Sequence, residues 1–239
     1  MFLTVVASAG CQPSVASERD DPPREPPERL TLKSAPTVRY HMRGHLGDLR
    51  EIERMLVHGH LADAKALAFR LTRREADPGM APLAADARQA VEIARGLAAA
   101  RSIDEALRYE ARVAETCAEC HLHAQKLPVF PPPAVVPPEL PTPPARMARH
   151  QWAADRLWEG MVGADEDRWR VGLDVLSRTP LPFSPLTDAP ALADNLQERA
   201  REALAARATD SLEKRATAYG EILVTCAACH TTLGKAAAR

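Results

Sequence analysis

Aromatic side chains are scarce in this chain. Phe, Trp and Tyr together make up 4% of the 239 residues, although 46% of the residues are hydrophobic, chiefly alanine and leucine. Alanine-rich helices pack thin cores, and a bulky apolar cofactor would fill the space that large aromatic side chains leave. Trp152, Trp158 and Trp169 stand at helical spacing, so we expect them to pack in a core.

Two further absences exclude whole classes of protein. Beyond the N-terminus, no segment approaches the roughly 20 apolar residues that a transmembrane helix needs. Lys and Arg number 31 against 32 Asp and Glu, so no charge imbalance points to nucleic acid or to another strongly charged partner. No convincing strand pattern is present either. The sequence therefore predicts an all-α protein, with room for two domains of roughly 100 residues.

A short apolar run, residues 1–10, precedes Cys11. Small residues just before a cysteine resemble the cleavage box of a bacterial lipoprotein, in which that cysteine is lipidated and becomes the mature N-terminus. We therefore predict a signal peptide with its lipobox over residues 1–11, lipidation of Cys11, and anchoring on the periplasmic side of a bacterial membrane. No Lys or Arg precedes the run, and Ser8 stands where a larger aliphatic residue is usual. An ordinary cleaved signal and a plain apolar N-terminus therefore stay open as alternatives.

Two segments lack helical periodicity. Residues 12–38 are rich in proline and charged residues, and we predict a disordered tether there. Nine of the seventeen residues from Pro128 to Pro144 are proline, which favours extended polyproline II and excludes helix. We predict a Pro-rich linker over residues 127–145, which separates a first domain over residues 39–126 from a second over residues 146–239.

The two predicted domains repeat one pattern. Residues 102–121 and 211–230 align without gaps at an offset of 109, and both end in Thr-Cys-Ala-x-Cys-His. Further upstream, Met42 and His45 correspond to Met147 and His150 at an offset of 105. Ordered matches at consistent offsets indicate an internal duplication.

Each half is predicted to form four helices, because apolar residues recur at helical spacing. Ser102 and Glu105 form a capping box before the fourth helix. The natural architecture is two tandem antiparallel four-helix bundles. The predicted helices lie near residues 41–58, 61–74, 82–100 and 102–124 in the first half, and near 146–162, 165–177, 190–207 and 210–233 in the second.

The sequence Cys-x-x-Cys-His, which is the attachment signature of heme c, occurs twice. On a helix, residues at i, i+3 and i+4 share one face, so two thiols can form thioethers with one heme while the imidazole reaches its iron. We predict two covalently attached hemes, held by Cys117, Cys120 and His121 and by Cys226, Cys229 and His230. A zinc site of the four cysteines would leave both histidines unexplained. A thiol redox motif normally occurs in a βαβ setting, which is absent from the predicted elements. A disulfide within each cysteine pair stays open as an alternative in an oxidising compartment.

A four-helix bundle whose heme motif lies near the end of its last helix resembles the class II cytochromes c, the cytochrome c-prime family. The resemblance covers about residues 41–126 and 146–235. In that family the first helix runs antiparallel beside the fourth and presents a residue to the distal face of the heme. The resemblance implies that His45 or Met42 in the first half, and His150 or Met147 in the second, lie at the distal iron face. An iron without a distal protein ligand also stays open.

Other histidines, His41, His58, His60 and His123, have no counterpart in the other half, and we expect surface or turn positions for them. No acid/base or substrate machinery is visible. We therefore predict a diheme electron carrier, not an enzyme, that passes single electrons between extracytoplasmic redox proteins or a membrane electron-transfer complex. A gas-binding or sensing protein with five-coordinate heme and a heme-dependent oxidoreductase are the alternatives.

Overall fold

The computed structural model describes residues 35–73, 81, 83–181, 189–206 and 211–237. The predicted signal peptide, the lipidation at Cys11 and nearly all of the predicted tether lie outside the described residues. Within the described ranges the chain forms eight helices and no strand, so the predicted all-α class is confirmed. The helices are α1 (Ala35–Val57), α2 (Leu61–Leu71), α3 (Ala84–Ala99), α4 (Ile103–His123), α5 (Pro143–Val162), α6 (Glu166–Arg178), α7 (Ala189–Ala205) and α8 (Leu212–Ala237).

Two helices begin earlier than the sequence predicted. Helix α1 begins at Ala35, inside the stretch predicted as tether. Helix α5 begins at Pro143, inside the predicted linker, after Thr142 at the N-cap. Proline is tolerated in the first turn because the N–H group that it lacks would have no partner within the helix. None of the described helices is long and apolar enough to cross a membrane.

The N-terminus of α4 shows how local sequence fixes a helix start. The Ser102 hydroxyl accepts a hydrogen bond from the Glu105 N–H at 3.1 Å, as the capping box predicts. The Glu105 carboxylate, however, accepts from the N–H of Arg101 at 2.7 Å, one residue before the N-cap. Gly59, in the turn between α1 and α2, has a φ of +89°, a conformation that residues with a side chain rarely adopt.

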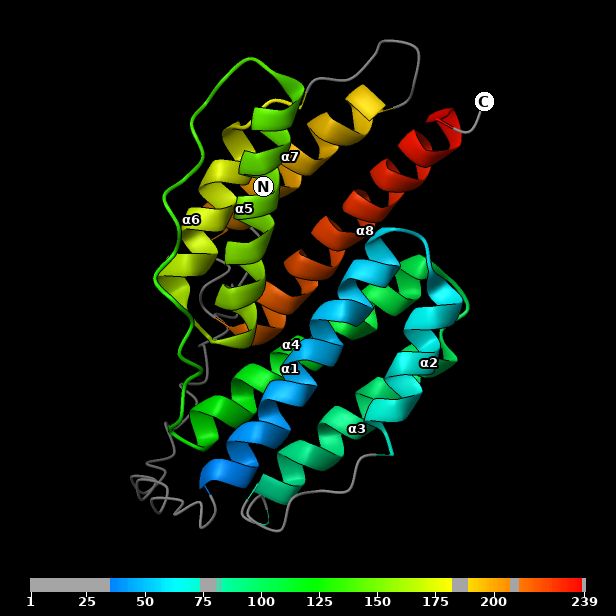
Figure 1. Cartoon of the computed structure of the whole chain (residues 1–239), viewed down its shortest axis with the longest axis vertical. Coiled ribbons are helices and arrows are strands. Elements are labelled where there is room, and N and C mark those ends of the chain that lie inside the picture. Colours follow the sequence, from blue (N-terminus) through cyan, green and yellow to red (C-terminus); the bar gives the residue numbers. More distant parts are fainter. Residues whose placement is uncertain (1–34, 74–80, 82, 182–188, 207–210, 238–239) are drawn as a thin grey trace, which may run out of the picture.

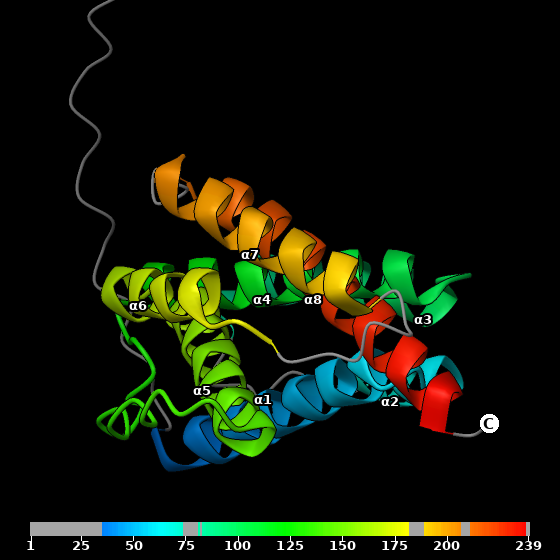
Figure 2. The ribbon, with the colours of Figure 1, turned by 90° about the horizontal axis from the view of Figure 1, so that it is seen from above.

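The helices form two groups that follow chain order (Figure 1). In the first group α1, α2, α3 and α4 pack consecutively and α1 also contacts α4, and α5 to α8 repeat this order in the second group. The two groups meet chiefly where α4 packs against α8, with α1 and α5 also reaching across (Figure 2). One continuous hydrophobic core therefore extends through both groups.

Helices α4 and α8 run antiparallel. Arg108 forms an ion pair with Glu221 at 2.8 Å, whereas Glu115, further along α4, is within electrostatic range of Glu213, which is earlier on α8. The helices pack closely at Gly220, where a Cβ would come into ordinary van der Waals contact, 3.5 Å, with the backbone of Arg108. The C-terminal ends of α4 and α8 therefore point away from each other.

The Pro-rich segment between α4 and α5 is extended and lies against the second group. Arg168 of α6 donates a hydrogen bond to the carbonyl of Pro131 at 3.0 Å. The Trp152 indole of α5 donates to the carbonyl of Ala134 at 2.8 Å. All three tryptophans are buried, which confirms their predicted core positions, and Trp169 packs edge-on against Tyr219.

Candidate functional site

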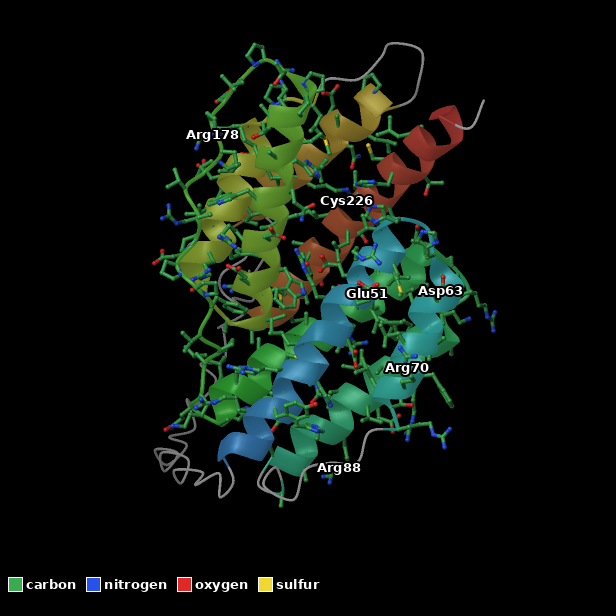
Figure 3. All side chains as sticks on the ribbon, viewed as in Figure 1. Glu51, Asp63, Arg70, Arg88, Arg178 and Cys226 are labelled. Atoms are coloured by element: carbon green, nitrogen blue, oxygen red, sulfur yellow. The ribbon has the colours of Figure 1, made fainter. Side chains whose placement is uncertain are left out.

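The two Cys-x-x-Cys-His sequences lie on α4 and α8, in each case on continuous helix. Their spacing places both thiols and the imidazole on one helical face. Cys226 lies where α8 passes α1, well inside the molecule, whereas labelled charged residues such as Arg88 and Arg178 lie at its outer edge (Figure 3). All four cysteines of the two motifs carry free thiols.

The surroundings of these thiols disfavour thiolate chemistry. Burial raises the pKa of Cys117 to about 12 and that of Cys226 to about 12. Burial likewise raises the pKa of Cys120 to about 11. Reactive redox cysteines and cysteines that ligate zinc act as thiolates, so they have lowered pKa values. The thiol redox interpretation therefore gains no support from the site.

The four cysteines cannot share one metal ion. Because α4 and α8 run antiparallel and each motif follows the point of closest packing, Cys117 and Cys226 lie toward opposite ends of the helix pair. Among the described residues, no group of three or more His, Cys, Asp and Glu side chains is placed to hold a metal ion. This geometry argues against the zinc alternative.

The motif histidines are held in the neutral form. Burial lowers the pKa of His121 and also that of His230, which His58 lowers further. The Nδ1 atom of His121 is buried and has no hydrogen-bond partner among the described residues. Neutral imidazole is the form that binds iron. A buried ring nitrogen without a partner is also expensive to leave as it is, unless a bound group satisfies it.

In the second half, the structure separates the two candidates for the distal position. His150 on α5 lies close enough to His230 that the two rings interact electrostatically, and burial together with His230 lowers the pKa of His150 to about 4. The Nδ1 atom of His150 is buried without a hydrogen-bond partner among the described residues. Met147, by contrast, is 38% exposed. Of these two, His150 is therefore the one brought to the motif.

The first half differs. Met42 packs against a small buried cluster of Val38, Leu83 and Ala124, and Cys120 packs against the same cluster. The His45 ring, one turn further along α1, lies 4.3 Å from the ring of His41. Met42 thus packs against the same cluster as Cys120 of the motif, whereas Met147, at the equivalent position in sequence, is 38% exposed.

His58 has a position that the sequence did not indicate. It is exposed at the end of α1, as predicted, but its ring lies 4.8 Å from that of His230 on α8. Its Nδ1 atom is 2.8 Å from the carbonyl oxygen of Arg54. This contact joins the two helix groups, and no local sequence signal could have revealed it. Of the other histidines, His123 pairs with Asp86 at 2.7 Å on the surface and His60 is exposed.

The residues present fit covalently bound heme. Each motif offers two neutral thiols and a neutral imidazole on one face of a helix, in a partly buried setting. Met42 in one half and His150 in the other come to the motif from a neighbouring helix. Heme c requires two thiols for its thioether bonds and an axial imidazole from Cys-x-x-Cys-His. A second axial ligand can come from another helix.

Comparison of the chain with protein-family models, with curated proteins and with solved structures gave no match. The function must therefore be inferred from the residues of the site itself.

A cluster of polar side chains lies buried where the two helix groups meet. We call Arg50 and Glu53 of α1, Glu110 of α4 and Tyr219 of α8 the central cluster. Sequence reasoning did not single out these residues. One signal was present: Glu110 interrupts the otherwise apolar, buried face of α4 that includes Ala106, Leu107, Ala111 and Ala114.

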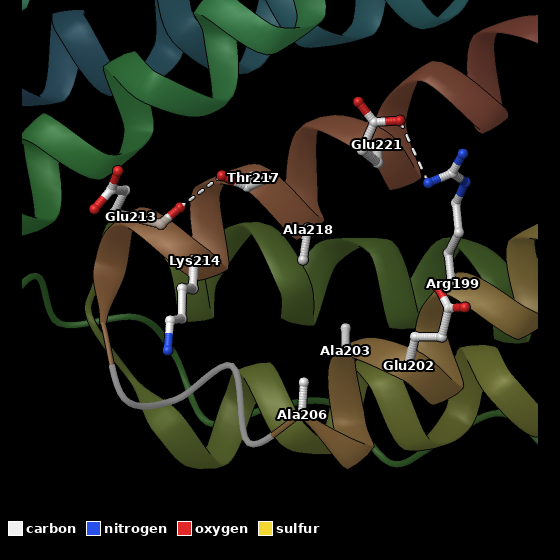
Figure 4. Close-up of a pocket in the computed structure, with 9 residues that line it drawn as sticks. All are labelled: Arg199, Glu202, Ala203, Ala206, Glu213, Lys214, Thr217, Ala218 and Glu221. Atoms are coloured by element: carbon white, nitrogen blue, oxygen red, sulfur yellow. Dashed lines mark hydrogen bonds and ion pairs between the residues drawn. The ribbon is translucent and has the colours of Figure 1, made fainter. Parts of the chain in front are cut away.

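A groove lined by described residues lies elsewhere. It has a volume of about 500 Å³ and lies between the end of α7 and the start of α8 (Figure 4). Charged side chains and alanines line it, and Arg199 pairs with Glu221 there at 3.3 Å. No cysteine or histidine of the motifs takes part in the lining, so the groove is separate from the candidate site.

Proposed function

We propose that this protein is a diheme c-type cytochrome that carries single electrons between extracytoplasmic or membrane-bound redox partners. The supporting observation is the repeated Cys-x-x-Cys-His sequence, which stands on equivalent helices, α4 and α8, with a Met or His side chain brought to each motif from another helix. The proposed heme-binding residues are Cys117, Cys120, His121, Cys226, Cys229 and His230.

In this proposal each half is a four-helix bundle that resembles the class II cytochromes c, and the two bundles dock through α4 and α8. Heme, when bound, supplies a one-electron couple on its iron. The chain's own residues hold it. Two thiols fix its orientation, the motif imidazole ligates the proximal side, and the packed helices exclude water.

For the distal positions we propose His150 in the second half and Met42 or His45 in the first. The choice of His150 over Met147 rests on burial and on proximity to His230. With a pKa of about 4, His150 stays neutral at pH 7 and is ready to bind iron. A thioether ligand raises a heme potential relative to an imidazole ligand, so a His-ligated second heme and a Met-ligated first heme would differ in potential.

The decisive experiment is to measure the mass of the protein expressed in a bacterial host that attaches heme c. We expect the mass to exceed that of the processed polypeptide by two hemes. Cys117→Ala combined with Cys120→Ala should remove one heme, and Cys226→Ala combined with Cys229→Ala should remove the other. Cys11→Ala is the matched control, because it removes a cysteine outside the motifs and should keep both hemes. A colourless wild-type protein of polypeptide mass would disprove the proposal.

Axial ligation is tested by low-temperature electron paramagnetic resonance. His150→Ala should convert the second heme from a low-spin to a high-spin signal, whereas Met147→Ala should leave both signals as they are. The opposite pattern would assign the distal position to Met147.

Carbon monoxide added to the reduced wild type distinguishes an electron carrier from a gas-binding protein. Unchanged absorption bands indicate two closed iron sites, and a shifted band indicates an open one.

We further propose that the protein works on the periplasmic side as a lipoprotein anchored through Cys11. This follows from the apolar N-terminal run and from the need to attach heme c outside the cytoplasm. Cys11→Ser should move the protein from the membrane fraction to the soluble fraction. Recovery of the wild type in the soluble fraction would contradict the anchor without affecting the assignment of the hemes.

A further inference from the structure

The central cluster contains a carboxyl group that the proposed function does not use. Glu110 is 0% exposed, and neither of its carboxyl oxygens has a hydrogen-bond partner among the described residues. The Glu53 carboxylate, by comparison, has two hydrogen-bond donors. It accepts a hydrogen bond from Arg50 Nη1 at 2.6 Å and another from the hydroxyl of Tyr219. A buried carboxylate without donors is strongly disfavoured, so Glu110 takes up a proton.

Every helix packed around the cluster contributes a group that bears on this proton. Glu53 of α1 repels negative charge on Glu110, and Arg50 of α1 attracts it. Tyr219 of α8 donates to Glu53, and Asp155 of α5 pairs with Arg50. Burial, reinforced by Glu53, raises the pKa of Glu110 well above its usual value. The proton is therefore held on Glu110 at a pH where an exposed glutamate has lost it.

The cluster lies midway between the two heme-binding motifs. Glu110 precedes Cys117 by seven residues on α4, and Tyr219 precedes Cys226 by seven residues on α8. Seven residues are two helical turns, or about 10 Å along the axis. Because α4 and α8 run antiparallel, the two motifs extend from the cluster in opposite directions. Electrostatic interactions link Glu110 to Cys117 and Glu53 to Cys226, one carboxyl group toward each motif.

We propose that Glu110 binds a proton when a neighbouring heme is reduced and releases it when that heme is oxidised, with Glu53 and Tyr219 as positioning residues. The inference rests on the proposed function, because it requires heme at the motifs. An external one-electron donor supplies the electron and solvent supplies the proton, so the buried region gains one negative and one positive charge together. Oxidation by the next redox partner returns both.

The hydrogen bonds of the cluster reach the surface. Arg50 donates to Glu53 and also pairs with Asp155, whose side chain is 38% exposed on α5. Glu110 takes no part in these hydrogen bonds. No other group of the central cluster has both buried carboxyl oxygens unpartnered within the described part of the chain.

The size of the coupling follows from Coulomb's law. A charge change at about 10 Å, at an effective dielectric constant of about 20, alters the proton affinity on the order of tenfold. A tenfold change for one electron corresponds to about 59 mV. The midpoint potential of at least one heme should therefore fall by about this amount as the pH rises through the range in which Glu110 titrates.

The experiment is a spectroelectrochemical titration of the full-length, heme-loaded protein across neutral and alkaline pH. In Glu110→Gln we expect the fall in potential to disappear. Tyr219→Phe should move the pH range downward, because Glu53 then loses a donor, binds a proton more readily and repels the Glu110 carboxylate less. Glu221→Gln is the matched control, because it removes a carboxylate from α8 near Cys226 whose two partners are arginines at the surface. This control should keep the wild-type pH dependence.

Several results would overturn the inference. The inference is wrong if the heme midpoint potentials of the wild type do not vary with pH. It is also wrong if Glu110→Gln retains the full fall in midpoint potential with rising pH. If Glu110→Gln fails to fold, Glu110→Leu and Tyr219→Phe give the same comparison. The heme content, measured by mass on each sample, separates this result from a failure of the proposed function. Two hemes with a flat pH profile reject only the role of Glu110, whereas a protein without heme rejects both.

Discussion

The burial of Glu110 has a consequence for folding stability that does not depend on heme. Its pKa is raised in the folded chain because the carboxyl group is buried and Glu53 lies nearby. A group with a raised folded-state pKa contributes stability fully below its unfolded-state pKa and loses this contribution as the pH rises through the folded-state pKa. Wild type should therefore lose stability with rising pH, and Glu110→Gln should lack this loss.

The magnitude follows from linkage. One proton bound only in the folded state changes the free energy of unfolding by about 1.4 kcal/mol per pH unit. For each pH unit between the unfolded-state and the folded-state pKa of Glu110, the stability of Glu110→Gln relative to wild type should therefore rise by about 1.4 kcal/mol. For a chain of this size, 1 kcal/mol shifts the melting temperature by about 2–4 °C, so the difference in melting temperature should grow by about 3–6 °C per pH unit.

The assay is thermal unfolding of both proteins, followed by circular dichroism, at several pH values. Glu92→Gln is the control, because this glutamate is 68% exposed on α3 and forms only a surface ion pair with Arg95. Its stability relative to wild type should not change with pH by more than about 0.5 kcal/mol. Parallel pH profiles of wild type and Glu110→Gln would contradict this prediction, because they would show that the Glu110 pKa is not raised in the folded protein.

Three further predictions concern packing and capping. Gly160→Ala should lower the free energy of unfolding by about 1–3 kcal/mol, because the new Cβ would lie 2.5 Å from a backbone nitrogen of α6. At Gly47 an added Cβ would have no atom within 4 Å, so Gly47→Ala should instead raise the free energy of unfolding by up to about 1 kcal/mol. Urea titrations measure both changes. Ser102→Ala should lower the melting temperature through loss of about 1 kcal/mol at the N-cap of α4, whereas Ser102→Asn should not. Trp152→Phe removes the indole hydrogen bond that holds the Pro-rich segment, so proteolysis within residues 127–142 should become about fivefold faster. Trp158→Phe, whose buried indole nitrogen has no partner among the described residues, should show no such increase, and equal rates in the two variants would contradict the assignment.

The sequence determined the helices well because their signals are local. Apolar spacing, the Ser102 cap and the turn at Gly59 placed most helix ends within about three residues of those observed. The main exception is the start of α1, where the proline and charged residues before Val38 masked a helix that begins at Ala35. The one face shared by Cys117, Cys120 and His121 is also local, since it follows from the helical repeat alone.

The equivalence of the two halves was only partly informative. The repeat predicted that Met147 would take the place of Met42, but Met147 is 38% exposed whereas Met42 packs with Cys120 against a buried cluster. A repeat in sequence fixes the position of a residue along its own helix. It does not fix how that helix rotates against its neighbour, which depends on all the side chains packed between them.

Sequence alone therefore determined the helices and the two Cys-x-x-Cys-His motifs on them, because both arise from residues less than two helical turns apart. The tertiary structure was needed to bring Glu53, Glu110 and Tyr219 together and to place His58 against His230. These residues lie on different parts of the chain, and His58 and His230 are 172 positions apart in the sequence. Such contacts form only when α4 docks on α8, and that docking is decided by the summed packing of one continuous core.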